Sequence, residues 1–216
     1  MTAAASAPAR PGPLRRPAGS GRSGRPVHSQ ATLLDSAVEA FIERGYEGTS
    51  MEHLAARLGI TKSSIYHHVM GKAELYLMAL DEAAARFAPL IDAVSAPDAG
   101  CRGAERPVRL VRSVLELPAD RQRPLELLLS IRDGREEAPG ALLRRRHLEA
   151  RVADVVGLAL RECGADEGAP VAVAVRTRLL LDLLCSLLVQ RRLGRLPATD
   201  ADGPAALAHL VTGCVR

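Results

Sequence analysis

One stretch of the sequence decides the fold: Gly59-Ile-Thr-Lys-Ser-Ser-Ile-Tyr-His-His-Val-Met-Gly-Lys72. Thr61 is a residue type that caps helices, so we expect a short helix to begin directly after it. Ile65 and Val69 lie four residues apart, which places both on one side of that helix. We expect this pair to face the core. Most of the other side chains of the helix are then left to point outward.

The outward side chains have the chemistry of a DNA-reading surface. Serine and lysine can reach base edges, and tyrosine and histidine can donate hydrogen bonds to phosphates. The N-terminal residues of such a recognition helix enter the major groove first. The two histidines are adjacent, so their side chains diverge by about 100° around the helix and do not suit a shared metal site. These outward residues are Lys62, Ser63, Ser64, Tyr66, His67 and His68.

Two helices are expected before this one. The first spans about residues 29–45, where apolar residues recur at helical spacing before a glycine. The second follows Thr49-Ser-Met-Glu52, which resembles a capping box in which Thr49 caps the helix and Glu52 reaches back. His53 on this helix is expected to face solvent, and Gly59 ends it. Two short helices joined by a tight turn with glycine predict a helix-turn-helix.

A longer pattern surrounds the helix-turn-helix: Phe41-x3-Gly45-Tyr46-x2-Thr49-Ser50-Met51-x2-Leu54-Ala55-x3-Gly59-Ile60-Thr61-x2-Ser64-Ile65-Tyr66-x5-Lys72-x2-Leu75. In order and spacing it resembles the tetracycline-repressor (TetR/AcrR) family of transcriptional regulators. The resemblance covers about residues 29–80, and the rest of the chain is similar only in the number and length of its helices. Val69 departs from the phenylalanine that the family most often has there, but it keeps the apolar, inward role.

The resemblance implies roles for individual residues. Thr49 and Lys72 match positions that contact phosphates. Residues 62–64 match base-reading positions, and residues 66–68 match positions that contact the DNA backbone or flanking bases. Alternatives stay open, in which the threonines are only helix caps, the tyrosine packs and the histidines are surface residues. The expected DNA-binding set is Thr49, Ser50, Thr61, Lys62, Ser63, Ser64, Tyr66, His67, His68 and Lys72.

Six more helical segments are expected downstream, separated mostly by glycine and proline turns. They lie at about residues 72–94, 106–117, 121–132, 139–163, 169–194 and 204–214. No stretch of the sequence is more typical of a strand. The sequence therefore predicts an all-α protein of about nine helices. Its N-terminal three-helix DNA-binding domain would span residues 29–75, and a helical effector-binding and dimerisation domain would span residues 76–216.

Residues 1–28 are rich in arginine, proline and glycine and contain no acidic residue, so we expect a disordered arm. The arm carries a charge of +5, and the rest of the chain carries −1. Such an arm can contact phosphates or enter a minor groove, and a solvated tail without defined contacts is the alternative. Residues 35–74 hold four basic and six acidic side chains. DNA affinity must then come from the placement of charges, from the arm and from dimerisation.

Other classes of protein are not expected. No apolar run approaches the ~20 residues of a membrane span, and no signal peptide is evident, so we expect a cytoplasmic chain. The scattered cysteines fit neither a disulfide framework nor a metal site, and we expect no metal and no cofactor. The motifs of hydrolases, phosphate-binding loops and zinc proteases are not found, so an enzyme is not expected. The cysteines are Cys101, Cys163, Cys185 and Cys214.

The last two expected helices carry more leucine than the core of one subunit needs, which favours a homodimer with a four-helix bundle at its interface. The expected interface residues are Leu180, Leu183, Leu184, Leu187, Leu188, Leu207 and Leu210. The alternative is that these leucines only close the core of their own subunit. A dimer also suits DNA reading, because two recognition helices match the two half-sites of a near-palindrome.

The resemblance implies a small-molecule effector that binds among the middle helices. No aromatic residue follows Phe87, so an aliphatic pocket suits an acyl chain or a similar apolar body better than a flat drug. Candidate effector contacts are Phe87, Arg112, Arg132, His147, Arg178 and Asp182, although most of these arginines could belong to solvated faces. We thus expect a homodimeric repressor that an effector releases from its operator. An effector-independent or architectural DNA-binding protein is the alternative.

Overall fold

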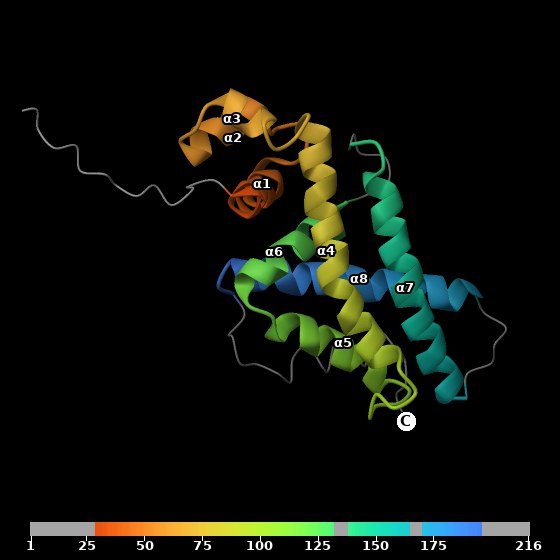
Figure 1. Cartoon of the computed structure of the whole chain (residues 1–216). Coiled ribbons are helices and arrows are strands. Elements are labelled where there is room, and N and C mark those ends of the chain that lie inside the picture. The colour runs from red at the N-terminus through yellow and green to blue at the C-terminus, as the bar shows by residue number, and fades with distance from the viewer. Residues whose placement is uncertain (1–28, 132–137, 165–169, 196–216) are drawn as a thin grey trace, which may run out of the picture.

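The computed structural model describes residues 29–131, 138–164 and 170–195 (Figure 1). Within these ranges the chain forms eight helices and no strand, which confirms the all-α prediction. None of these helices is long and apolar enough to cross a membrane. The helices are α1 (Gln30–Arg44), α2 (Met51–Leu58), α3 (Lys62–Tyr66), α4 (Lys72–Ser95), α5 (Glu105–Glu116), α6 (Ala119–Ser130), α7 (Ala141–Glu162) and α8 (Pro170–Arg192).

Some of the expectations concern residues outside these ranges. The arm at residues 1–28 and the ninth helix at residues 204–214, with Leu207 and Leu210, lie there. Arg132 also lies outside the described residues.

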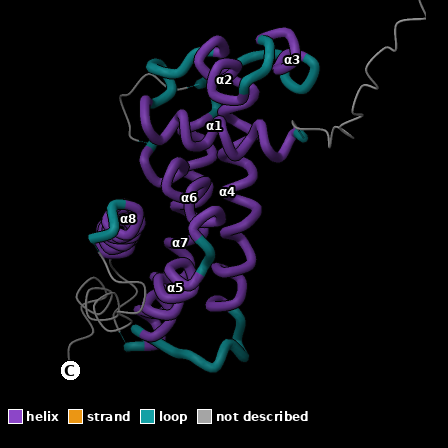
Figure 2. Tube along the Cα trace, turned by 90° about the vertical axis from the view of Figure 1, so that its left-hand side faces the viewer, coloured by secondary structure: helices purple, strands orange, loops and turns teal. Residues whose placement is uncertain are grey.

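The first three helices form the expected helix-turn-helix unit at one end of the molecule (Figures 1 and 2). The Ser29 hydroxyl caps α1 by accepting a hydrogen bond from the backbone N–H of Thr32 at 3.3 Å. Gly59 ends α2 with φ +67°, a left-handed conformation that glycine adopts without strain. This glycine allows the tight turn that brings α3 against α2.

Helix α4 joins the helix-turn-helix unit to the rest of the chain. It runs from the helix-turn-helix unit toward the opposite end of the molecule and packs against α1, α5, α6 and α7 (Figures 1 and 2). At its first end, Tyr76 meets Phe41 of α1 edge-on, with ring centroids 4.8 Å apart. The expected domain boundary after residue 75 falls inside α4, so the two parts of the chain share one continuous helix.

A chain of charged side chains connects α1 with α8 through α6. Arg123 of α6 lies 3.1 Å from a carboxylate oxygen of Glu39 on α1. Glu126, one turn further along α6, has a side chain only 5% exposed. Arg192 at the end of α8 donates to this buried carboxylate at 2.9 Å, and Arg123 lies 3.6 Å from its other oxygen. These ion pairs therefore connect α8 to α6 and α6 to α1; we call them the α1–α6–α8 charge chain.

The end of the molecule far from the helix-turn-helix is fastened by a second ion pair. Arg106 of α5 is buried and holds both carboxylate oxygens of Glu162 on α7, at 2.8 and 2.7 Å. The backbone N–H of Gly103 donates to the same carboxylate at 2.6 Å. Arg106 also donates to the carbonyls of Val94 and Ala96, which end α4. This one guanidinium thus holds α4, α5 and α7 together.

Candidate nucleic-acid interface

Helix α3 presents the surface that the sequence predicts. Ile65 and Val69 are buried, at 0% and 3% exposure, which confirms that they face the core. Ser64 is half-buried, because its side chain leans back toward the helix cap. The remaining expected contact residues of this helix and the turn after it are exposed: Lys62, Ser63, Tyr66, His67 and His68.

The exposed face begins at a well-capped helix end. Thr61 is the N-cap of α3, as expected, and its hydroxyl oxygen accepts the backbone N–H of Ser64 at 3.2 Å. The hydroxyls of Thr61 and Ser64 are also 2.8 Å apart. Because capping fixes the first turn of a helix, it fixes where the exposed side chains of α3 project. Contact of these residues with DNA stays a prediction.

The cap of α2 differs from the expected capping box. The N-cap is Ser50, whose hydroxyl oxygen accepts the backbone N–H of His53 at 3.1 Å. Thr49 is 1% exposed, and its hydroxyl points to the carbonyl oxygens of Gly45 at 2.8 Å and Ala40 at 3.2 Å. The expectation that Thr49 caps α2 is therefore wrong, while its contact with phosphate stays a prediction. Its hydroxyl instead fastens the turn between α1 and α2.

Glu52 also departs from the expected capping box, because its carboxylate reaches forward to Lys62 of α3. The ion pair between them lies at the surface, with side chains 45% and 65% exposed for Lys62 and Glu52. The carboxylate raises the pKa of Lys62, and the ammonium lowers the pKa of Glu52. The Lys62 ammonium also lies 5.9 Å from the centroid of the Tyr66 ring. Because the pair is exposed, exchanging the carboxylate for a base edge costs Lys62 little.

Lys72 occupies the first position of α4 and is half-buried. Its ammonium donates to the carbonyl oxygen of Tyr46 at 2.9 Å and lies 4.1 Å from the centroid of the Tyr46 ring. The lysine thus holds the start of α4 against the turn between α1 and α2. An ammonium has three donors, so this bond leaves capacity for a phosphate.

Two residues at this end of the molecule differ from the sequence-based expectations. Met70 is 86% exposed in the turn between α3 and α4, and sequence reasoning missed it as a possible DNA contact. The sequence contains an indication of this exposure, because Met70 does not share the i, i+4 spacing of the buried residues Ile65 and Val69. His53 was expected to face solvent, but it is half-buried, and its Nε2 has no hydrogen-bond partner among the described residues.

The expected effector contacts lie in different environments in this conformation. Phe87 is 1% exposed and belongs to the core. Arg112 and His147 are exposed at the surface, and their contact with an effector stays a prediction. Arg178 is also exposed and pairs with Asp182 at 3.5 Å, because the two residues lie one turn apart on α8. Of these charged candidates among the described residues, only Asp182 is half-buried.

Helix α8 turns most of its leucines inward. Leu180, Leu184, Leu187 and Leu188 are buried in the core of their own subunit, which corrects their assignment to the dimer surface. Leu183 is half-buried. The large apolar side chains that the described part of α8 exposes are instead Val175 and Leu179, at 52% and 51% exposure. They lie four residues apart, and so they share one outward face of the helix.

The chain is similar to known transcriptional regulators. The family model described as "Bacterial regulatory proteins, tetR family" matches residues 33–79. The transcriptional activator FasR of Mycolicibacterium smegmatis is 39% identical over 69 residues, which are 31% of this chain and 32% of FasR. The chain thus matches about a third of the length of this curated relative.

Solved structures extend the similarity to most of the chain. SCO3833, a TetR-family member from Streptomyces coelicolor, is 38% identical over 85% of this chain and 90% of its own, with a TM-score of 0.63. AibR in complex with isovaleryl coenzyme A and operator DNA has the same fold at a TM-score of 0.63. It is 19% identical over 83% of this chain and 96% of its own.

Proposed function

The chain belongs to the TetR family of transcriptional regulators, and we propose that it acts as a homodimer whose two α3 helices read a near-palindromic operator. The observation that carries the proposal is that α3 and the turn after it have two faces. Ile65 and Val69 are buried, while Lys62, Tyr66 and His67 are exposed on a capped helix and its C-cap at one end of the molecule. Lys62 would read a base edge, and Tyr66 and His67 would contact the DNA backbone or flanking bases.

Further contacts would surround the recognition helix. Ser63 and Ser64 would complete the base-reading set, and Lys72 would contact a phosphate from the start of α4. Ser50 is exposed at the N-cap of α2, where a helix end attracts anions. The exposed Met70 suits apolar contact with a thymine methyl group or a sugar.

The dimer would form through the outward face of α8. Val175 and Leu179 expose apolar surface there, and the half-buried Leu183 continues the same face one turn later. One helix-turn-helix with this few basic residues binds DNA weakly, so two copies on one rigid dimer supply affinity and fix the spacing of the half-sites.

The effector would bind the part of the chain after residue 75, between the helices that surround Phe87. The buried side chains of α4 to α8 are mainly leucine, valine and alanine, which suit an acyl chain. The coenzyme A ester bound by AibR supports this chemical class. Effector binding would release the operator, as in a repressor, if it favours a geometry in which the two α3 helices no longer match the half-sites.

The α1–α6–α8 charge chain supports a route for this coupling. If effector binding among the middle helices moves α6 or α8, the ion pairs of Arg123 and Glu126 would carry that movement to α1. The exposed pairs contribute little free energy each, but the carboxylate of Glu126 is buried, so its charge depends on its arginine partners for stabilisation.

The proposal is tested by selecting DNA. Purified protein is incubated with fragments of its own genome, and the bound fragments are sequenced. The proposed function requires a few fragments that share a short palindrome. Fragments without a common motif would contradict it and would favour an architectural DNA-binding protein. Acyl-coenzyme A esters of increasing chain length are then added to the recovered operator, and loss of binding with some of them is expected.

A further inference from the structure

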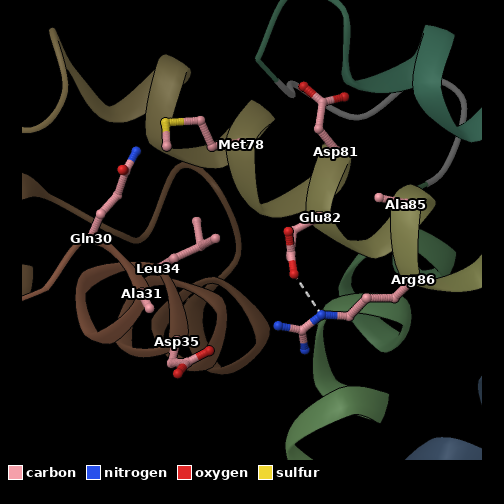
Figure 3. A pocket seen from close by; sticks show the side chains of 9 residues that line it. All are labelled: Gln30, Ala31, Leu34, Asp35, Met78, Asp81, Glu82, Ala85 and Arg86. Atoms are coloured by element: carbon pink, nitrogen blue, oxygen red, sulfur yellow. Dashed lines mark hydrogen bonds and ion pairs between the residues drawn. The ribbon is translucent and has the colours of Figure 1, made fainter.

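An open groove of about 540 Å³ lies between helices α1 and α4 (Figure 3). The groove lies beside the first turn of α1, where the described part of the chain begins. Apolar side chains from both helices contribute to its walls, with Leu34 on α1 and Met78 on α4. The full lining consists of Gln30, Ala31, Leu34, Asp35, Met78, Asp81, Glu82, Ala85 and Arg86.

The lining carries three carboxylates and one guanidinium, so it is negative in net charge. Arg86 pairs with Glu82 at 2.6 Å, and Arg144 of α7 pairs with Asp81 through two hydrogen bonds of 2.5 and 2.7 Å. Asp35 is exposed and forms no ion pair with any of the described residues. The groove therefore offers a cation one unpaired carboxylate and two that are already paired at the surface.

The segment just before α1 has the complementary chemistry. Residues 20–28 read Ser-Gly-Arg-Ser-Gly-Arg-Pro-Val-His, with two arginines and no acidic residue. Val27 and Pro26 next to Arg25 provide an apolar part beside the charge. This pattern matches a groove whose apolar walls are bordered by carboxylates.

The segment is also long enough to reach the groove. Asp35 lies six residues after Ser29 on a helix that rises about 1.5 Å per residue, so it is about 9 Å along α1. Arg25 precedes Ser29 by four residues, which span up to about 14 Å when extended. The glycines and the proline of the segment allow the turn that directs it back along α1.

We propose that residues 20–28 of the chain dock in the α1–α4 groove when DNA is absent. Arg25 pairs with Asp35, and Val27 packs against Leu34 and Met78. If the proposed function holds, this docking competes with DNA for the arginines of the arm, and operator binding releases the segment. The docking itself does not depend on the proposed function.

A single tryptophan tests the docking in the full-length protein without DNA. The chain contains no tryptophan, so Val27→Trp gives one emitting residue in the segment. We expect blue-shifted emission and protection from acrylamide, because the ring lies against apolar side chains. At about 1 M NaCl, where the screening length is about 3 Å, the emission is expected to approach that of solvent-exposed tryptophan.

A matched pair of charge changes identifies the groove. In the Val27→Trp background, Asp35→Lys is expected to raise the undocked fraction roughly fivefold, since a surface attraction becomes a repulsion. Asp98→Lys makes the same charge change at an exposed residue beyond the far end of α4, and it should leave the emission unchanged. Circular dichroism verifies that both variants keep their helices.

Three results would overturn the proposal. Solvent-like emission from Val27→Trp would show that the segment does not dock, and the groove would remain available to another cationic molecule. Equal effects of Asp35→Lys and Asp98→Lys would show that the segment responds to the net charge of the protein and not to the groove. Protected emission that is insensitive to Asp35→Lys would place the tryptophan elsewhere. None of these results bears on operator recognition, which the DNA selection tests separately.

Discussion

The ammonium of Lys72 donates to the carbonyl oxygen of Tyr46 at 2.9 Å and lies 4.1 Å from the centroid of the same residue's ring. This contact joins the first residue of α4 to the turn between α1 and α2. The lysine that we propose as a phosphate contact therefore also positions the helix-turn-helix on α4. Its two roles predict two separate effects when the side chain is removed.

Lys72→Ala is expected to weaken binding by similar factors on different DNA sequences and to lower the salt slope by about 1, because one phosphate contact is lost. It is also expected to reduce the free energy of unfolding by about 0.5–1 kcal/mol through loss of the cation–π contact. Fluorescence anisotropy at several salt concentrations and thermal unfolding measure the two effects. Lys72→Arg is the control, since it keeps the charge. An unchanged salt slope in Lys72→Ala would leave Lys72 a purely structural residue.

Thr49 and Ser50 are neighbours with opposite environments, and they give a matched test. Thr49→Val removes a buried hydroxyl from two carbonyl oxygens, so we expect a loss of about 1–2 kcal/mol in unfolding free energy and no change in the salt slope. Ser50→Ala removes an exposed cap and is expected to cost about 1 kcal/mol. Denaturant unfolding and DNA titration distinguish the variants. A salt slope lowered by Thr49→Val would contradict this expectation and support the phosphate contact of Thr49.

These two residues also show how far the sequence can predict the site. The pattern around residues 59–72 gave the helix-turn-helix, its buried pair and its exposed face, because helical periodicity and capping are local properties. Thr49 and Ser50 are both good capping residues, and only the path of the preceding turn decides which hydroxyl faces the helix. That path depends on the packing of α1 against α4.

The prediction that these leucines of α8 form the dimer surface was wrong for a different reason. Leucines 180, 184, 187 and 188 recur at helical spacing, which identifies an apolar face but not its partner. A core of the same subunit and a second subunit offer the same environment to a leucine. The structure separates the two cases, since the exposed face of α8 carries Val175 and Leu179 instead. The effector candidates are distributed over several helices, and local pattern says little about contacts between them.

The outward face of α8 makes a prediction about assembly. Leu179→Glu is expected to convert the dimer to a monomer, because a carboxylate would be buried at the interface without a partner. Leu143→Glu is the control, since Leu143 is 71% exposed in the first turn of α7. Sedimentation velocity measures the oligomeric state of both variants. A dimeric Leu179→Glu would exclude this face from the interface.

The Arg106–Glu162 pair predicts a pH dependence of stability. The hydrogen bonds from Arg106, followed by the one from the Gly103 N–H, lower the pKa of Glu162 from 4.5 to about 2. The folded protein therefore binds a proton less readily than the unfolded chain. The contribution of the pair is complete above about pH 4.5 and is lost as the pH falls toward 2.

Glu162→Gln measures that contribution. We expect it to lower the unfolding free energy at neutral pH by about 2 kcal/mol, less than for a fully buried pair because the Glu162 side chain is partly exposed. The difference in unfolding free energy between Glu162→Gln and the unmodified protein should decrease as the pH falls through the range in which the Glu162 carboxylate is protonated. Urea unfolding at a series of pH values gives this difference. A difference that stays constant with pH would show that the charge of Glu162 does not stabilise the fold.

The central claim is that the exposed face of α3 reads the operator, and one comparison tests it most directly. The genomic DNA selection is run with the unmodified protein, with Lys62→Ala/His67→Ala on α3, and with Arg112→Ala/His147→Ala as a control of similar chemistry on exposed sites elsewhere. We predict that the unmodified protein and the control recover the same palindrome, while the α3 variant loses it or recovers one with altered base preference. Recovery of the same palindrome with the same base preference by the α3 variant would contradict the claim.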